Sequence, residues 1–434
     1  MSIAIFLVGT IFVLILVGIP VFASLGLAGI ASLFALPSTN SVVASTPLLV
    51  VSQSIYTTIS FFPLFAIPFF ILAGEIMNRG GLTDKLIRFA LLLIGRAPAS
   101  LAQANIVSSV LFGGMNGSAQ ADTSCIGSVL IPAMVKEGYG KAFSAAVTAS
   151  SSVCAPMIPP SIMLIIYGVT VNASIGALFM GGLLPGVMIG ISLMIVVAIL
   201  NVKHKFPRRT ERLPMGEKFR IVIDAILPLG LPVIIVYGIR GGVVTPTEAV
   251  AVAYSLFVCM LILRTVKIAD LYPMFLRAAT MSACILLIIA CAKIIGYGLT
   301  VLQVPTILGN FFLSVSESPY VFLLLVNLLL LVMGMFMDGA ACVVVLAPIL
   351  TPIAMTLGID PVHFGLVMVL NMVIGTCTPP LGVCLFIACN IARIPFEQGA
   401  KAIMPFLAAE ITVLMLITYL PDVALFLPKY LGYM

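Results

Sequence analysis

A polar stretch at residues 114–124, GMNGSAQADTS, lies within an otherwise strongly apolar chain. It contains the amides of Asn116 and Gln120, three hydroxyl groups and the carboxylate of Asp122. Backbone carbonyls freed at a helix end, together with Ser, Thr and Asn oxygens, suit a hard monovalent cation such as sodium. The positive end of a half-helix in turn favours a carboxylate ligand. The stretch therefore predicts a site that binds an ion and an anionic solute.

The rest of the chain has the composition of a membrane protein. Of its 434 residues 62% are hydrophobic and 8% are charged, and the mean hydropathy is +1.26. Apolar runs of about 20 residues, which are long enough to cross a bilayer, recur along the sequence. The first run continues directly into a second and has no cleavage site, which excludes a signal peptide. We predict an all-α polytopic membrane protein.

The basic residues predict the orientation of this protein in the membrane. The linker 202–220 is dense in Lys and Arg, so the positive-inside rule places it in the cytoplasm. Most other basic residues then also fall in the cytoplasm, with Arg240, Lys293 and Lys429 as exceptions, and both termini are periplasmic. The net charge of +6 is therefore a topology signal, not a nucleic-acid-binding patch.

The sequence repeats itself after a shift of 220 residues. The matching residues are prolines: Pro132 with Pro352, Pro159-Pro160 with Pro379-Pro380, and Pro185 with Pro405. If each half has five crossings and one segment that enters and leaves on the same side, the halves face opposite ways in the membrane. The pattern predicts two inverted-topology repeats, 1–201 and 221–434, as in secondary transporters.

Each repeat contains two breaks in its apolar segments. The polar stretch interrupts the segment 100–135, and GMFMDGAACVV interrupts the segment 319–352 at the same place, with Ser118 opposite Asp338. Irregular backbone at membrane depth is tolerated only where protein or a water-filled cavity surrounds it. We therefore predict a re-entrant helical hairpin in each repeat, with its tip at the break.

The second break in each repeat is the Pro-Pro pair, at 154–161 and at 375–382. Proline lacks an N–H donor and so unwinds a helix and exposes carbonyl groups. A hairpin tip that faces an unwound helix makes one ion site per repeat, with the substrate between the two sites. Lys and Arg are nearly absent from these stretches, so we expect half-helix N-termini, hydroxyls and sodium to hold the anion.

Other polar residues within the apolar segments allow two roles each. Asp122 either caps the second half-helix of its hairpin or binds the ion, and Lys293 either extends to the membrane surface or helps to hold an anion. Glu410 pairs with another helix or with a partner subunit. Glu75 and Glu248, at helix ends, are expected to be structural.

Several segments resemble the large membrane subunit (M or DctM type) of tripartite ATP-independent periplasmic (TRAP) transporters. The resemblance covers essentially the whole chain and is carried by LAGEIMNRGGLTDKLI (72–87), FGGMNGSAQADTSCIGSVLIPAMVKEGY (112–139), APMIPPS (155–161), TPTEAVAVA (245–253) and MDGAACVVVLAPIL (337–350).

The resemblance implies a subunit of the bacterial inner membrane that imports organic acid anions, such as sialic acids or C4-dicarboxylates, with sodium ions as coupling ions and without other cofactors. It implies two partners, a small four-helix membrane subunit (Q type) and a periplasmic substrate-binding protein (P type). Because no small-subunit span precedes Met1, we expect the unfused form. The sialic-acid branch is the expected branch. The resemblance also implies an elevator mechanism, in which a transport domain, approximately 100–170 plus 319–390, slides against a scaffold formed by the remainder.

The family's sodium sites lie at the hairpin tips and on the facing unwound helices. In the first half they correspond to Asn116, Gly117, Ser118, Ala155, Ile158 and Pro160. In the second half the internal repeat carries them to Asp338, Gly339, Gly375, Thr376, Thr378 and Pro379. Asp338 opposite Ser118 makes the two sites chemically unequal.

Two other functions fit the residues alone. One is a stand-alone sodium-coupled dicarboxylate or citrate symporter, which would need no binding protein. The other is an intramembrane enzyme, but the sequence contains neither a GxSxG nor an HExxH motif. We therefore expect a transporter and not an enzyme.

Overall fold

The chain folds into helices in a computed structural model. The structure describes residues 17–34, 47–95, 97–207, 214–240, 268–301 and 318–433, together with 9–10, 13–14 and 303. The predicted span near 246–264, which contains Glu248, lies outside the described residues. All regular elements within the described ranges are α-helices or short 3₁₀ helices.

The first described elements build a layered N-terminal part. They are α2 (Val21–Phe34), α4 (Pro47–Ile59), the 3₁₀ helix η1 (Phe62–Phe65), α5 (Ala66–Arg79) and α6 (Leu82–Ile94). Helix α6 was not predicted. It is amphipathic, because Leu82, Leu86 and Ala90 recur every four residues on its buried face. It is also too short to form one of the long apolar runs from which the spans were predicted.

The remaining elements include both predicted breaks in each half. The first half continues with α7 (Ser100–Asn116), α8 (Ala119–Lys136), α9 (Lys141–Ser151), the 3₁₀ helix η2 (Ser152–Met157), α10 (Ile162–Val171) and α11 (Ile175–His204). The second half contains α12 (Met215–Arg240), α14 (Ile268–Val301), α16 (Pro319–Phe336), α17 (Gly339–Thr356), α18 (Pro361–Gly375), α19 (Val383–Ala392), α20 (Phe396–Tyr419) and α21 (Pro421–Tyr430).

The helix boundaries follow the 220-residue shift. In the first hairpin α7 ends at Asn116 and α8 begins at Ala119, and in the second α16 ends at Phe336 and α17 begins at Gly339. Both Pro-Pro pairs lie in non-helical backbone, and both have a cis peptide bond. The break therefore falls at the same place in each half.

Six helices in the described part of the chain are long and apolar enough to cross a membrane. The number is seven if α9–η2 and α10, which meet at an angle of 43°, are counted as one broken span. These helices make the protein a multi-pass membrane protein. The apolar run at 402–428 predicts one last span, but the structure divides it, because Pro421 starts the separate helix α21.

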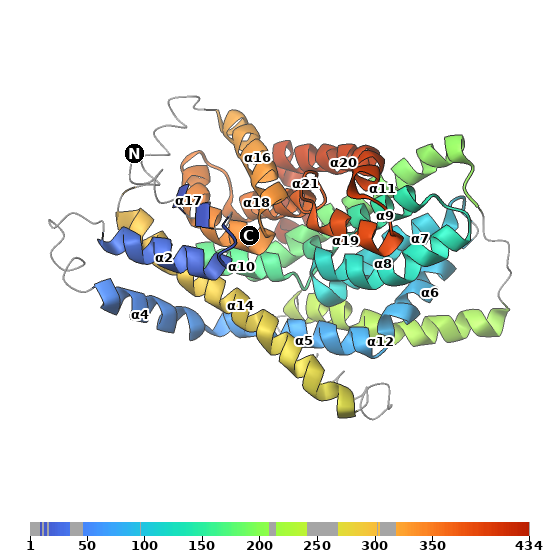
Figure 1. The fold of residues 1–434 in the computed structure, drawn as a ribbon, viewed down its shortest axis with the longest axis horizontal. Helices are drawn as coiled ribbons and strands as arrows, with labels where there is room; N and C mark the ends of the chain where they lie inside the picture. The colour runs from blue at the N-terminus through green and yellow to red at the C-terminus, as the bar shows by residue number, and fades with distance from the viewer. Residues whose placement is uncertain are drawn as a thin grey trace.

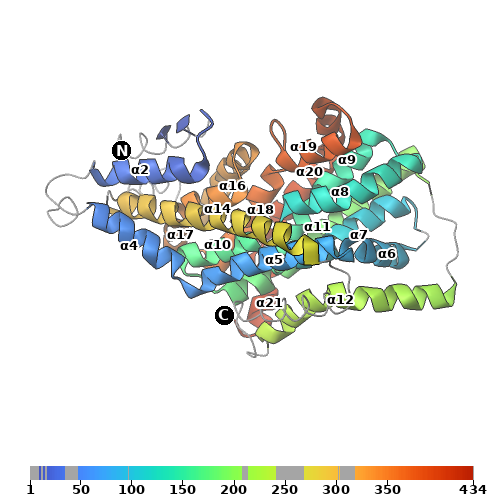
Figure 2. The ribbon, with the colours of Figure 1, turned by 60° about the horizontal axis from the view of Figure 1, so that its bottom comes forward.

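The helices separate into a dense body and a layer beside it. The body consists of α7–α10 and α16–α19; within it, α19 packs on α8 and α9, and α18 packs on α16 and α17. Beside it, the long helix α14 lies along α2, α4 and α5 in both views (Figure 1, Figure 2). Helix α14 also contacts α17, so the two parts share an interface.

Candidate functional site

The first hairpin turns at Gly117 and Ser118. Gly117 has a φ of 59°, a left-handed conformation that favours glycine and ends α7. Ser118 is extended and caps α8, since its Oγ accepts a hydrogen bond from the backbone N–H of Ala121 at 3.5 Å. The tip therefore joins the carbonyl end of one half-helix to the N–H end of another.

The first tip lies directly against the unwound segment. A Cβ on Gly117 would collide with the carbonyl oxygen of Pro160, and a Cβ on Gly113 would come within 2.7 Å of the Cα of Ala155. The structure thus brings the tip together with Ala155 and Pro160, as predicted. Ile158 is different, because its side chain packs towards α11, where a Cβ on Gly186 would lie 2.8 Å from its Cγ1.

The second hairpin turns at Asp338, which caps α17. Its Oδ2 accepts hydrogen bonds from the backbone N–H groups of Ala340 at 3.1 Å and of Ala341 at 3.4 Å. A carboxylate at a helix N-terminus is also favoured by the helix dipole. Asp338 nevertheless stays exposed, so one of its oxygens can take a further partner.

The second unwound segment follows Gly375. A Cβ on Gly375 would lie 2.6 Å from the Cα of Gly334, so α16 and α18 touch backbone to backbone at this point. The hydroxyl of Thr376 donates to the carbonyl of Val373 at 2.6 Å, and that of Thr378 donates to Ile374 at 2.8 Å. Both hydroxyl oxygens keep lone pairs that can accept or bind a cation.

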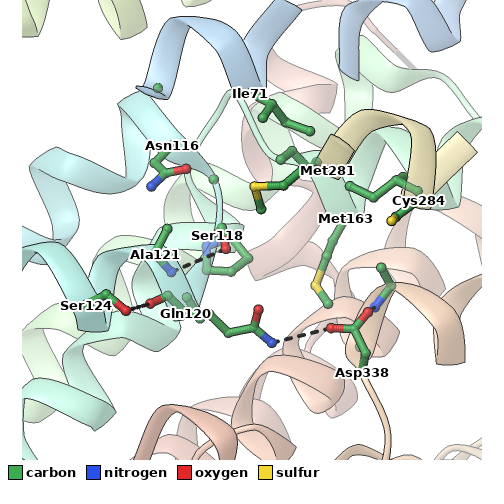
Figure 3. A pocket seen from close by; sticks show the side chains of 18 of the residues that line it. Ile71, Asn116, Ser118, Gln120, Ala121, Ser124, Met163, Met281, Cys284 and Asp338 are labelled. Carbon is green, nitrogen blue, oxygen red and sulfur yellow. Dashed lines mark hydrogen bonds between the residues drawn. The ribbon is translucent and has the colours of Figure 1, made fainter. Parts of the chain in front are cut away.

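The two tips share one cavity of about 540 Å³, which is also bounded by α5 and α14 (Figure 3). Six of the predicted residues line it: Asn116, Gly117, Ser118, Asp338, Gly339 and Thr376. The other six predicted residues do not line it: Ala155, Ile158, Pro160, Gly375, Thr378 and Pro379. The first group faces the cavity, whereas Ala155, Pro160 and Gly375 lie where backbone packs against backbone behind the tips.

A hydrogen bond joins the tips across the cavity. Gln120, in the first turn of α8, donates from Nε2 to Oδ1 of Asp338 at 3.4 Å (Figure 3). Gln120 belongs to the polar stretch 114–124 but is not among the predicted site residues. Its position in that stretch could have identified it as a site residue.

The cavity wall contains further polar residues that are not among the predicted site residues. Glu75 and Asn78 on α5, Ser124 on α8, and Arg277 and Thr280 on α14 all line the cavity. Glu75 is thus part of the wall and not only a residue at a helix end. We expected Lys and Arg to be nearly absent from the site, and this was wrong for Arg277. Arg277 was missed because it lies on α14, outside the predicted hairpins.

Two buried carboxylates lie outside the cavity. Asp122 and Glu410 are both 0% exposed, and within the described part of the chain their carboxylate oxygens have no hydrogen-bond partner. Asp122 does not cap α8, because Ser118 does. Glu410 is buried inside the protein on α20, so it faces a helix of this chain and not a partner subunit.

The cavity wall carries several kinds of polar group. It combines two helix N-termini, Asn and Gln amides, hydroxyls, two carboxylates and one guanidinium. Among the residues that the structure describes, no group of three or more His, Cys, Asp or Glu side chains could hold a metal ion. In general, helix N-termini favour anions, and oxygen ligands suit a hard monovalent cation.

Comparisons with known proteins show the family and the fold of this chain. The family model described as "Tripartite ATP-independent periplasmic transporter, DctM component" matches residues 8–423. The isethionate TRAP transporter permease protein DctMQ of Oleidesulfovibrio alaskensis is 39% identical over 95% of this chain and 64% of its own length. The sialic acid TRAP transporter large permease protein SiaM of Vibrio cholerae is 37% identical over 97% of each chain. The solved structure of the Alcanivorax borkumensis YdaH transporter has a TM-score of 0.60 at 15% identity, over 90% of this chain and 89% of its own, and so shares the fold.

Proposed function

Because this chain belongs to the DctM-component family of TRAP transporters, we propose that it is a large permease subunit that imports an organic acid anion with a sodium gradient. The proposal includes two partners, a small membrane subunit and a periplasmic binding protein that delivers the solute. It also places the protein in the bacterial inner membrane with both termini in the periplasm. The relatives act on isethionate and sialic acid by their names, so the solute class is a small carboxylate or sulfonate.

One observation carries this proposal. Two tips that are more than 200 residues apart in the sequence meet at a single cavity, and Gln120 and Asp338 bond across it. A solute in this cavity contacts both halves of the chain at once. It also contacts α5 and α14, which line the same cavity, so binding is coupled to the position of the tips against these helices, as a carrier requires.

Sodium coupling is supported by the chemistry of the tips. The first tip offers the side-chain oxygens of Asn116 and Ser118 beside the carbonyl of Pro160, and the second offers Asp338 near Thr376. These are oxygen ligands of the kind that hard cations prefer. A bound sodium ion at each tip would also offset the charge of Asp338 and Glu75 when an anionic solute enters.

An elevator movement is supported by the packing. We propose two inverted repeats whose hairpins and unwound helices form the transport body, and a scaffold of α2, α4, α5, α6, α12 and α14. Helix α11 packs on α7, η2 and α18, and α20 packs on α9 and α18. We therefore assign α11 and α20 to the moving part, which enlarges the domain expected from the sequence.

The test is uptake into proteoliposomes that contain this chain and its small membrane subunit. Labelled sialic acid, succinate and isethionate are offered in turn, with and without the binding protein and an inward sodium gradient. We expect uptake of one solute that requires both additions. Uptake with sodium but without the binding protein would instead establish a stand-alone symporter, and absence of uptake for all three would refute the proposal.

A further inference from the structure

A second cavity of about 290 Å³ lies further along the interface between the scaffold and the transport body. Helices α10 and α17 form one wall, and α14, α4 and the segment around η1 form the other. Its polar lining consists of Thr58, Thr170, Asn172, Lys293 and Tyr297. The hydroxyls of Thr58 and Thr170 donate to the carbonyls of Ser54 and Ile166. Asn172, Tyr297 and the ammonium of Lys293 are the donors left to receive an anion.

One scaffold helix serves both cavities. Helix α14 lines the first cavity from Arg277 to Ile288 and the second from Ile289 to Tyr297. The 16 residues from Arg277 to Lys293 correspond to about 24 Å along a helix with a rise of 1.5 Å per residue. Because Ile285, Ile288 and Ile289 line the stretch between them, the two cations are separated by apolar surface.

The opposite wall also continues from one cavity to the other. Helix α10 lines the first cavity with Met163 and the second with Thr170, and α17 does so with Gly339 and Val344. Gly339 belongs to the second hairpin tip. A slide of the transport body along α14, in the direction from the first cavity to the second, therefore carries the tips towards Lys293.

Each cavity has one basic residue in its wall, Arg277 or Lys293. Both side chains are exposed, and neither forms an ion pair within the part of the chain that the structure describes. A charge at membrane depth is costly unless it has a partner, and such residues usually lie on solute or ion pathways. A guanidinium pairs with a carboxylate or a sulfonate through two hydrogen bonds, whereas an ammonium acts as a point charge.

We propose that Arg277 and Lys293 are two stations for the acidic group of the transported anion, one at each end of the path of the tips. This inference rests on the proposed function. Arg277 holds the carboxylate or sulfonate while the tips lie at the first cavity. Lys293 receives it when the tips have moved to the second cavity, so the fixed scaffold supplies a counter-charge in both positions.

If the two basic residues only set the topology, substituting them changes the KM on neither face in particular. If they are stations for the anion, each substitution raises the KM on one membrane face only. The solute that wild-type protein transports is measured in counterflow, with its KM determined separately from each membrane face. The variants are Arg277→Gln and Lys293→Gln, with Arg277→Lys and Lys293→Arg as charge-conserving partners. Lys401→Gln is the matched control, because Lys401 is an exposed lysine on α20 that lines neither cavity.

Arg277→Gln is expected to raise the KM about tenfold on one face, and Lys293→Gln about tenfold on the opposite face, since each removes one charge-assisted contact. Lys293→Arg and Lys401→Gln stay close to wild type, whereas Arg277→Lys keeps the charge but loses the two-bond geometry and raises the KM less than Arg277→Gln does. Unchanged KM values, or effects of both variants on the same face, would overturn the proposal.

If the wild-type protein transports none of the three solutes, the proposed function is refuted. A second measurement, of binding, then still tests the first station. The chain contains no tryptophan, so Met281→Trp in the first cavity is a single fluorescent reporter. Its emission is titrated in nanodiscs with sialic acid, succinate and isethionate. Saturable binding that Arg277→Gln weakens about tenfold supports the first station. Equal affinity with and without Arg277→Gln, or no response to any of the anions, would overturn the proposal.

Discussion

Gln120 Nε2 lies 3.4 Å from Asp338 Oδ1, although 218 residues separate them in the chain. Gln120 lies in the first turn of α8, just after the first hairpin tip, and Asp338 caps α17 at the second tip. Two such N-termini at one cavity concentrate positive helix-dipole ends on one solute. The bond therefore marks the place where both halves of the protein meet at one cavity.

Asp338→Asn separates the role of the Asp338 charge from its role as a helix cap. Asn caps a helix about as well as Asp, so thermal stability should stay within about 0.5 kcal/mol of wild type. Loss of a charged ligand, worth about 1.5–3 kcal/mol, should weaken apparent sodium or solute affinity by about tenfold or more. Sodium-dependent uptake measures this.

The control for Asp338→Asn is Asp360→Asn. Asp360 caps α18 in the same way, with its Oδ1 accepting from Val362 at 2.7 Å and from His363 at 3.2 Å, but it does not line the cavity. Uptake by Asp360→Asn should equal that of wild type. An Asp338→Asn variant with normal sodium dependence would reduce Asp338 to a structural cap.

Ser118→Ala should weaken the sodium dependence of uptake while the protein still folds. The substitution removes a cavity-lining hydroxyl and an N-cap, which costs about 1 kcal/mol of stability. The half-saturating sodium concentration should rise several-fold. Ser128→Ala is the control, since the Ser128 hydroxyl donates to the carbonyl of Cys125 on the same helix and lies away from this cavity. If both variants have the same sodium curve, Ser118 is not a ligand.

Gly375→Ala should destabilise the protein. The new Cβ would lie 2.6 Å from backbone atoms of Gly334, so α16 and α18 must separate, which costs about 1–3 kcal/mol. Gly216→Ala, where nothing lies within 4 Å, should instead leave stability unchanged or raise it by up to about 1 kcal/mol. Heating followed by size-exclusion chromatography ranks the two variants. A Gly375→Ala protein as heat-resistant as wild type would contradict the observed backbone contact.

Glu410→Gln should not reduce stability. The carboxylate is fully buried and its oxygens have no hydrogen-bond partner within the described residues, so a neutral amide of the same shape avoids the cost of a buried charge. The same heating assay should give equal or greater resistance than wild type. A clear loss of stability or of sodium dependence would instead show that the negative charge of Glu410 is used. Glu397→Gln, at an exposed position on the same helix, is the control.

The sequence was sufficient for the class of protein and for the position of the breaks. Long apolar runs, the repeated prolines and the polar stretch at 114–124 are local signals, because hydrophobicity, missing N–H donors and glycine flexibility act on neighbouring residues. For the same reason Asn116, Gly117, Ser118 and Asp338 were recognisable as tip residues. The resemblance to the TRAP family rested on equally local segments.

Only the tertiary structure decided which residues share the cavity. Arg277 and Glu75 reach it from α14 and α5, and nothing in their own segments distinguishes them from topology signals or helix-end charges. Glu410 is buried because α20 packs on α9, and α11 lies against η2 and α18. Such assignments depend on how distant helices pack. A linear pattern predicts which face of a helix is apolar, but not which helix will cover it.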